Sequence, residues 1–181
     1  MTKPVVRAAG ENDMPAIQKI YGHHVLHGLG TFELTPPSTE ELVRRWQDVT
    51  AQDMPYLVCV DAGIVTGYAY AAPYRPRPAY RYSVEDSVYV GPDGGRRGYG
   101  RLLVSALIDR CTELGMRQML AVIGDRDNQG SIGLHRSLGF DEAGRLPSVG
   151  YKHGRWVDVV IMQRALGLGD TALPDDTDAK P

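Results

Sequence analysis

A glycine-rich turn is the first stretch of this sequence whose residue types suit a chemical task. It covers residues 94–100 (GGRRGYG) and stands between a strand-like segment, 82–90, and a long amphipathic segment, 101–114. Glycine lets a backbone turn tightly and approach a ligand without a Cβ in the way. The first N–H groups of a helix lack internal partners, and the helix dipole adds partial positive charge there. The turn therefore suits a pyrophosphate, with Arg96 and Arg97 supplying charge for a further phosphate.

Such a turn is also an ordinary connection between a strand and a helix, so alone it does not identify a phosphate site. Two better-known phosphate motifs are excluded. The Gly-Lys-Ser/Thr of a P-loop is missing from the sequence. A Rossmann fingerprint belongs to the first βα unit of its fold, whereas this turn lies in the middle of the chain.

A carboxylate in the middle of a predicted strand is the second chemical candidate. Glu85 lies within residues 82–90, and acidic residues have poor strand propensity. Either Glu85 faces solvent on a half-exposed strand, or it takes the proton that an amine must lose before it can attack a thioester. Asp86 points to the opposite face of the strand and is the weaker candidate.

Arginines and histidines supply the remaining candidates. Arg75 and Arg81 flank a proline-rich crossing just before Glu85. They either lie solvated in a loop or hold a substrate carboxylate, with which a guanidinium pairs bidentately. The histidines of the first helix lack carboxylate or cysteine partners at metal-ligand spacing, so no metal site is expected. We interpret His24 as a packing residue, and His23 and His27 as surface residues.

The elements that must position these residues follow from periodicity and turn signals. Helices are expected after Asp13, as its cap, after a capping box of Ser38 and Glu41, over 101–114, and in the segment 128–139. Strands are expected at 5–9, 56–61, 64–71, 82–90, 116–123, 148–151 and 156–162, with a hairpin turn at Ala62-Gly63. Strands dominate the first half and a βαβα order the second, so the fold class is α/β, a mixed and mostly antiparallel sheet flanked by helices.

This order of features resembles the core of the GNAT superfamily of acetyltransferases, which carries Gln/Arg-x-x-Gly-x-Gly/Ala at the turn and binds the acetyl-CoA pyrophosphate there. Gly95 replaces the usual Gln or Arg, a small loss because backbone amides make the main contacts. The sequence resembles phosphinothricin and methionine sulfoximine N-acetyltransferases more closely, over nearly all of the ordered chain. That resemblance rests on Thr31-Phe32, Pro73-Tyr74-Arg75, Arg81-Tyr82, Val84-Glu85, Ser87-Val88-Tyr89-Val90, Ala121-Val122-Ile123, Asn128, Ser131, Leu134-His135 and Lys152-His153-Gly154-Arg155-Trp156.

The resemblance implies acetyl-CoA as co-substrate and a small-molecule amine as acceptor, without a metal. The cofactor-binding residues that it implies are Val88, Tyr89, Val90, Gly95, Arg96, Arg97, Gly98, Tyr99, Gly100, Asn128 and Ser131. It makes Glu85 the general base, while the backbone amides of 87–90 are the natural donors to the oxyanion. His135 stands where many relatives have a tyrosine that protonates the leaving thiolate; a cofactor contact or packing is the alternative.

On the substrate side, the resemblance implies an apolar wall at Phe32, a histidine at His153 and a carboxylate site at Arg75 and Arg81. It also suggests a homodimer. No serine or cysteine is expected beside a base as a nucleophile, so we predict direct attack by the amine in a ternary complex. Alternatives are an acetyltransferase for another amine, such as a protein N-terminus, a polyamine or an antibiotic, or a CoA-binding protein without catalysis.

Length and composition agree with one globular domain. The 181 residues include 43% hydrophobic residues and carry a net charge of −2, which gives no reason to expect nucleic acid or a membrane as partner. Cys59 and Cys111 lie in apolar runs and are expected as small buried residues. No apolar stretch suggests a signal or a membrane span, so the expected location is the cytoplasm. The acetyltransferase domain is predicted to cover 1–166, and the acidic, proline-containing segment 167–181 to be a disordered tail.

Overall fold

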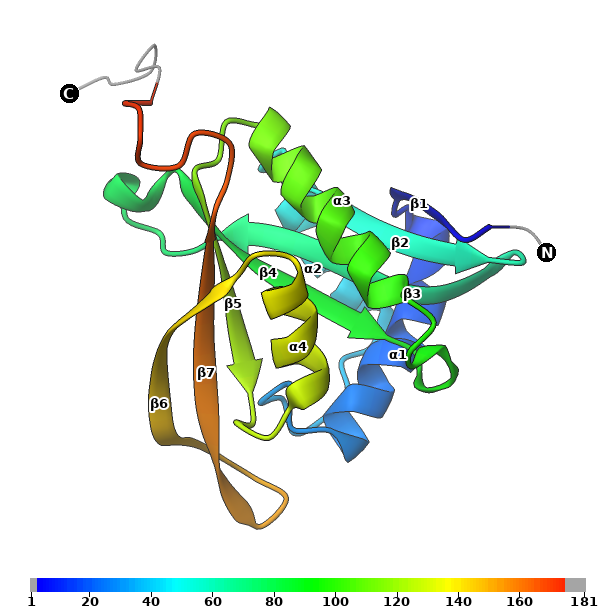
Figure 1. Ribbon diagram of the computed structural model, residues 1–181. Helices are drawn as coiled ribbons and strands as arrows, with labels where there is room; N and C mark the ends of the chain where they lie inside the picture. Colours follow the sequence, from blue (N-terminus) through cyan, green and yellow to red (C-terminus); the bar gives the residue numbers. More distant parts are fainter. Residues whose placement is uncertain (1–2, 175–181) are drawn as a thin grey trace.

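The computed structural model describes residues 3–174 (Figure 1). Within them a seven-stranded sheet has the order β1-β2-β3-β4-β5-β7-β6. Its strands are β1 (Val5–Ala8), β2 (Tyr56–Asp61), β3 (Ile64–Pro73), β4 (Ser83–Val90), β5 (Gln118–Gly124), β6 (Asp141–Lys152) and β7 (Arg155–Ala165). The expected mixed α/β sheet is confirmed.

One pair of neighbouring strands distinguishes this sheet. β4 and β5 run parallel, whereas the other neighbours pair antiparallel. The parallel pairing runs only from Ser83–Gln118 to Asp86–Ala121. Beyond it β4 continues beside β3, and β5 continues beside β7. The two strands therefore separate halfway along β4, and the backbone edges that face the gap have no strand partner.

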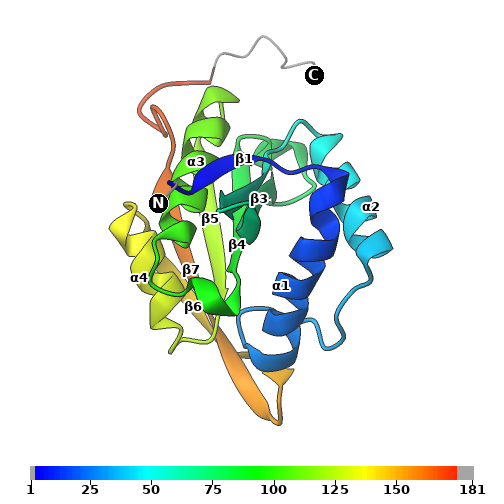
Figure 2. The same ribbon diagram turned by 90° about the vertical axis from the view of Figure 1, so that its right-hand side faces the viewer.

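Among residues 3–174, four α-helices cover the two faces of the sheet (Figure 2). α1 (Met14–His27) and α2 (Thr39–Thr50) lie on one face, and α3 (Tyr99–Glu113) and α4 (Gln129–Ser137) on the other. Two apolar cores result, because alternate strand residues point to opposite faces. Val58 and Tyr68 pack under α1 and α2, whereas Leu57 and Ala69 pack under α3.

Of the two helix caps predicted in the N-terminal half, the side chain of one forms the capping hydrogen bond and that of the other does not. Ser38 caps α2, accepting the Glu41 N–H at 3.2 Å, as expected. Asp13 was wrongly expected to cap α1 with its side chain. Its carboxylate instead accepts the Gly10 N–H at 2.8 Å and pairs with Arg7 at 2.7 Å. A cationic partner on β1 therefore takes the carboxylate away from the helix amides.

The last two strands are longer than the sequence pattern indicated. β6 begins at Asp141 rather than near Ser148, and β7 extends to Ala165. The register of β6 against β7 shifts twice, between Glu142 and Gly144 and between Leu146 and Gly150. Each shift interrupts the alternation of apolar residues on which a strand prediction depends. The predicted buried state of the two cysteines is confirmed; both are free thiols.

The described residues after β7 stay in contact with the domain. Leu166 is buried, and Arg117 donates to the Leu173 carbonyl at 3.4 Å. Residues 175–181, the second part of the predicted acidic tail, lie outside the described residues, so the domain limit at 166 and the disorder stay predictions. In the part of the chain that is described, no helix is long and apolar enough to cross a membrane.

Candidate active site

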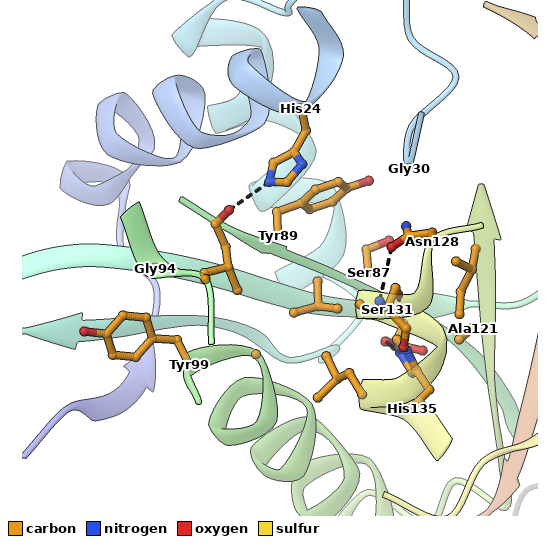
Figure 3. Close-up of a pocket in the computed structure, with 18 of the residues that line it drawn as sticks. His24, Gly30, Ser87, Tyr89, Gly94, Tyr99, Ala121, Asn128, Ser131 and His135 are labelled. Carbon is orange, nitrogen blue, oxygen red and sulfur yellow. Dashed lines mark hydrogen bonds and ion pairs between the residues drawn. The ribbon is translucent and has the colours of Figure 1, made fainter. Parts of the chain in front are cut away.

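A cavity of about 490 Å³ opens where β4 and β5 separate (Figure 3). Its wall includes residues from both faces of the sheet. His24 and Tyr89 come from the side of α1, and Asp86 and His135 from the side of α3 and α4. The gap between the two strands therefore lets one cavity reach both faces.

The glycine-rich turn forms one end of the cavity. α3 begins at Tyr99, after Gly98 in the left-handed region at φ 83°. The first helical bond runs from Leu102 N–H to the Gly98 carbonyl, so the N–H groups just before it lack helical acceptors. A Cβ on Gly95 or Gly98 would meet nothing within 4 Å. Free N–H groups thus border open space at the positive end of a helix, as a pyrophosphate requires.

The two arginines of the turn have different positions. Arg96 lines the cavity. Arg97 does not; its guanidinium pairs with Asp61 at 3.2 Å and lies over the Tyr99 ring. Tyr99 is itself buried and donates its hydroxyl hydrogen to Asp61. Asp61 therefore holds Arg97 and Tyr99 as supports of the turn, and Arg96 is the arginine that faces the cavity.

Backbone amides of β4 form the floor of the gap. The pairing of β4 with β3 runs in unbroken register to Val90, so β4 has no bulge against β3. The backbone amides of β4 are instead exposed because β5 diverges from β4. The Val90 carbonyl accepts a hydrogen bond at 2.8 Å from Nε2 of His24, which places the backbone groups of Val90 on the open side. By strand alternation those of Val88 share that side. Their N–H groups are available to an acyl oxygen or an amide of a cofactor.

His24 is a cavity residue that the sequence interpretation missed. It was taken for packing, whereas it lies half-buried in the wall and orients the end of β4 through Val90. Burial, which outweighs the bond to Val90, lowers the pKa of its imidazole, so the ring is neutral near pH 7. A polar residue on the apolar stripe of a helix was the available signal.

Glu85 lies on the α1 and α2 face of β4, half-buried and outside the wall of the main cavity. Burial raises the pKa of its carboxyl, Arg75 opposes the rise, and Asp86 adds to it. A half-buried carboxylate with a raised pKa is a suitable general base. The effect of Arg75 on Glu85 shows that the structure brings these two predicted residues near each other.

Asp86 and His135 form a buried pair on the other face of β4. Nε2 of His135 lies 3.0 Å from Oδ2 of Asp86, and the two residues are 2% and 5% exposed. Nδ1 of His135 lies 2.8 Å from the Ser131 carbonyl and 3.4 Å from the Ser131 hydroxyl. Burial is the largest single effect and lowers the pKa of His135. Asp86 and the Ser131 carbonyl together raise the pKa more, so the net shift is upward. Asp86 therefore does point away from Glu85, as expected, yet it faces a titratable partner.

This arrangement bears on the prediction that no serine lies beside a base. Ser131 does lie beside His135, but Nδ1 is closer to a carbonyl, which only accepts. Nδ1 must therefore carry a hydrogen, so it cannot take one from the Ser131 hydroxyl. Ser131 is not an activated nucleophile in this geometry.

Phe32 lies in the loop between α1 and α2, which is held against the other end of the sheet. Its ring, 40% exposed, occupies the space that the missing side chain of Gly150 leaves on β6. The buried ammonium of Lys152 donates to the Thr31 carbonyl at 2.7 Å. The Lys152 bond to Thr31 and the packing of Phe32 on Gly150 together hold this part of the loop on β6. The Phe32 ring is therefore a fixed apolar surface.

The remaining predicted substrate residues lie on the surface. Arg75 is exposed over the ring of Tyr74, and Arg81 over the ring of Tyr82. His153 is exposed in the turn between β6 and β7, at φ 50°. Of these residues, Arg75 lowers the pKa of Glu85.

Asn128 has a structural task besides its place in the cavity wall. Its side-chain oxygen caps α4 by accepting the Ser131 N–H at 3.2 Å. The cap fixes the helix that carries Ser131 and His135. Among residues 3–174, no group of three or more His, Cys, Asp or Glu side chains is placed to hold a metal ion.

Comparisons with known proteins agree with this geometry. Residues 6–161 match the model of the acetyltransferase (GNAT) domain. The chain is 49% identical over 170 residues to phosphinothricin N-acetyltransferase of Alcaligenes faecalis, covering 94% of this chain and 86% of that protein. It is 39% identical to the L-methionine sulfoximine/L-methionine sulfone acetyltransferase of Salmonella typhimurium, covering 94% and 98%. A crystal structure of a phosphinothricin acetyltransferase from Sinorhizobium meliloti, in complex with acetyl-CoA, superposes with a TM-score of 0.94 at 45% identity, covering 97% and 95%.

Proposed function

The chain belongs to the GNAT acetyltransferases, and from that premise we propose that it acetylates the α-amine of a small amino acid. It is an acetyl-CoA-dependent N-acetyltransferase of the phosphinothricin and methionine sulfoximine type. Methionine sulfoximine and phosphinothricin are accordingly the first substrates to test. The finer points, which are the acceptor and the mechanism, rest on the arrangement of the site.

The observation that carries the mechanism is the cavity through the sheet. Acetyl-CoA would lie with its pyrophosphate at residues 95–100 and its thioester over the amides of Val88 and Val90. Glu85 and His135 approach from opposite faces of β4. The amine and the leaving sulfur can then occupy opposite sides of the acyl carbon at once, which favours direct attack in a ternary complex.

The reaction would proceed in three steps. Glu85 takes a proton from the substrate ammonium, directly or through a water, and the amine nitrogen attacks the thioester carbon. The N–H groups of Val88 and Val90 stabilise the oxyanion that forms. The C–S bond then breaks and its electron pair stays on sulfur, while the nitrogen gives its second proton to solvent. His135 is the source of the proton that the thiolate takes up.

Arg75 supports an amino acid as acceptor. Its guanidinium is close enough to Glu85 to lower the pKa of that carboxyl, so a substrate carboxylate at Arg75 would leave an α-amine near the base. Arg81, Phe32 and His153 would complete the substrate side. Losing a charge-assisted contact costs about 2–3 kcal/mol, or roughly 30- to 150-fold in kcat/KM.

The test is thiol release from acetyl-CoA with methionine sulfoximine, phosphinothricin and other amines, each amino acid being compared with its carboxamide. The acids should exceed the amides by that factor in the wild type and lose the advantage in Arg75→Ala. Arg77→Ala, a nearby exposed arginine without a proposed contact, is the control. Equal rates for acid and amide would eliminate the carboxylate site, and a preference for peptide N-termini or polyamines would replace the amino acid as acceptor.

A homodimer is the second part of the proposal. The β6–β7 hairpin exposes apolar side chains along an edge of the sheet, namely Leu146, Val149, Tyr151 and Trp156. A second copy that covers them would bury the surface that an isolated chain leaves in water. Sedimentation velocity should give a dimer that Trp156→Glu dissociates; a monomer for the wild type would refute this part.

A further inference from the structure

We propose that Asp86, His135 and Ser131 form a proton relay to the departing CoA sulfur, in which Asp86 is a positioning residue acting through His135. The proposal rests on the acetyl transfer proposed above and deepens it. All three residues contribute to the wall of the same cavity. Ser131 and His135 are four residues apart on α4 and so share one face of the helix.

The hydrogen-bond partners determine how many protons the relay holds. Nδ1 of His135 faces a carbonyl at 2.8 Å and Nε2 faces a carboxylate at 3.0 Å. Both partners accept, so both ring nitrogens carry hydrogen, and the ring is a cation. Asp86 is the counter-charge that lets this cation exist in a site where the ring is only 2% exposed.

The second carboxylate oxygen of Asp86 strengthens this assignment. Oδ1 is buried and has no hydrogen-bond partner among the described residues. A buried carboxylate with an unfilled oxygen depends on its one cationic contact for compensation. Replacing Asp86 by a neutral residue would therefore destabilise the imidazolium form of His135.

Other titratable groups near the pair are few. Cys111 of α3 faces Asp86, and burial raises the pKa of its thiol to about 12, so it stays uncharged. Glu85 directly precedes Asp86 on β4 but points to the opposite face. The third neighbour, Phe140, packs edge-on against the His135 ring and carries no charge. Asp86 is thus the group that controls the protonation of His135.

The proton steps balance as follows. The C–S bond of the tetrahedral adduct breaks, and its electron pair stays on sulfur. Sulfur takes the hydroxyl proton of Ser131, and the Ser131 oxygen takes the proton from Nδ1 of His135, 3.4 Å away. The ring is left neutral, with Nε2–H still donated to Asp86. The nitrogen of the adduct gives its second proton to solvent as the C–S bond breaks. After CoA leaves, solvent returns a proton to the ring, and Glu85 releases the proton that it took from the substrate ammonium.

The experiment combines rates with the protonation state of His135. In the wild type, the ring ¹⁵N signals of His135 should be those of an imidazolium at pH 7.5. Asp86→Asn should move the basic limb of the kcat–pH profile and the His135 titration to lower pH together. Asp86→Asn and Ser131→Ala should each lower kcat at pH 8 by about 10- to 100-fold. This loss is below the usual range for a general acid because a thiolate of pKa near 8.5 leaves with little help.

Each result of these measurements either supports or overturns the proton relay. A neutral His135 in the wild type at pH 7.5 overturns the proposal without any variant, even if Asp86→Asn fails to fold. Unchanged pH profiles in a folded Asp86→Asn, or an unchanged kcat in Ser131→Ala, overturn it as well. Absence of thiol release by the wild type with every amine would instead refute the proposed function, so the two failures are distinguishable.

Discussion

Gly150→Ala should damage amine recognition by moving one ring. A Cβ at position 150 would lie 2.9 Å from Cζ of Phe32 and closer still to its Cδ1 and Cε1. Non-bonded carbon atoms keep about 3.5–4.0 Å apart, so the ring must move by about 1 Å or more. A displacement of that size at a surface that positions substrate can cost up to about 100-fold in rate.

We therefore expect kcat/KM for the amino acid to fall about 10- to 100-fold in Gly150→Ala. The dissociation constant of acetyl-CoA should stay within about twofold, because β4, α3 and α4 form the cofactor wall. The free energy of unfolding should change by only about 1 kcal/mol, since the ring is already 40% exposed. Steady-state kinetics, calorimetric titration with acetyl-CoA and thermal unfolding measure the three quantities.

The same strand provides a matched control. A Cβ on Gly144, also in β6, would meet nothing within 4 Å, so Gly144→Ala should keep wild-type kinetics. Adding Phe32→Ala to Gly150→Ala should cost less than the two single changes combined, because removing the ring removes the clash. Wild-type kcat/KM in Gly150→Ala would refute the reasoning that Phe32 is a fixed wall of the amine site.

Two further predictions concern the base and the cofactor turn. Glu85→Gln should lower kcat by about 10²–10⁴-fold with acetyl-CoA affinity preserved. Because burial raises the pKa of Glu85, wild-type activity should fall with decreasing pH through a limb above the ordinary carboxyl value; a Gln variant that kept this limb would place the base elsewhere. Gly98→Val should weaken acetyl-CoA binding by about tenfold or more. Gly115→Val is the control, because Gly115 has a similar φ of 78° and equally open space at the other end of α3, and it should leave binding unchanged. Equal losses in the two variants would show that backbone strain, not the phosphate contact, is responsible.

Much of the fold was predictable because its signals are local. The capping serine of α2, the Ala62-Gly63 hairpin and the glycine turn before α3 each depend on the chemistry of a few neighbouring residues. The start of β6 was missed because two register shifts hide its alternation. Asp13 does stand at the N-cap position of α1, but its carboxylate does not cap the helix because its partner, Arg7, lies on another element.

Site residues could be predicted from the sequence where the residue type and its immediate neighbours indicate the chemistry. Glu85 was notable as an acid within a strand, but the pairing of Asp86 with His135 joins residues 49 positions apart and has no local signal. Arg97 stays a predicted phosphate ligand, and its pairing with Asp61 on β2 has no local signal either. His24 was hidden because its acceptor is a backbone carbonyl of β4. In each case the deciding partner is remote in sequence.

The separation of β4 from β5 has a consequence for how such an enzyme can change. The surfaces that border the gap on the α3 and α4 side come from chain segments 94–100 and 128–135, whereas Phe32 and Gly150 belong to a loop and a hairpin on the other side. Substitutions in that loop and hairpin can therefore alter the acceptor without disturbing the donor. The two halves of the reaction are free to evolve at different rates, and a library confined to 32–37 and 148–156, which leaves out the cavity residue Gly30, should yield new acceptor preferences on an unaltered acetyl-CoA site.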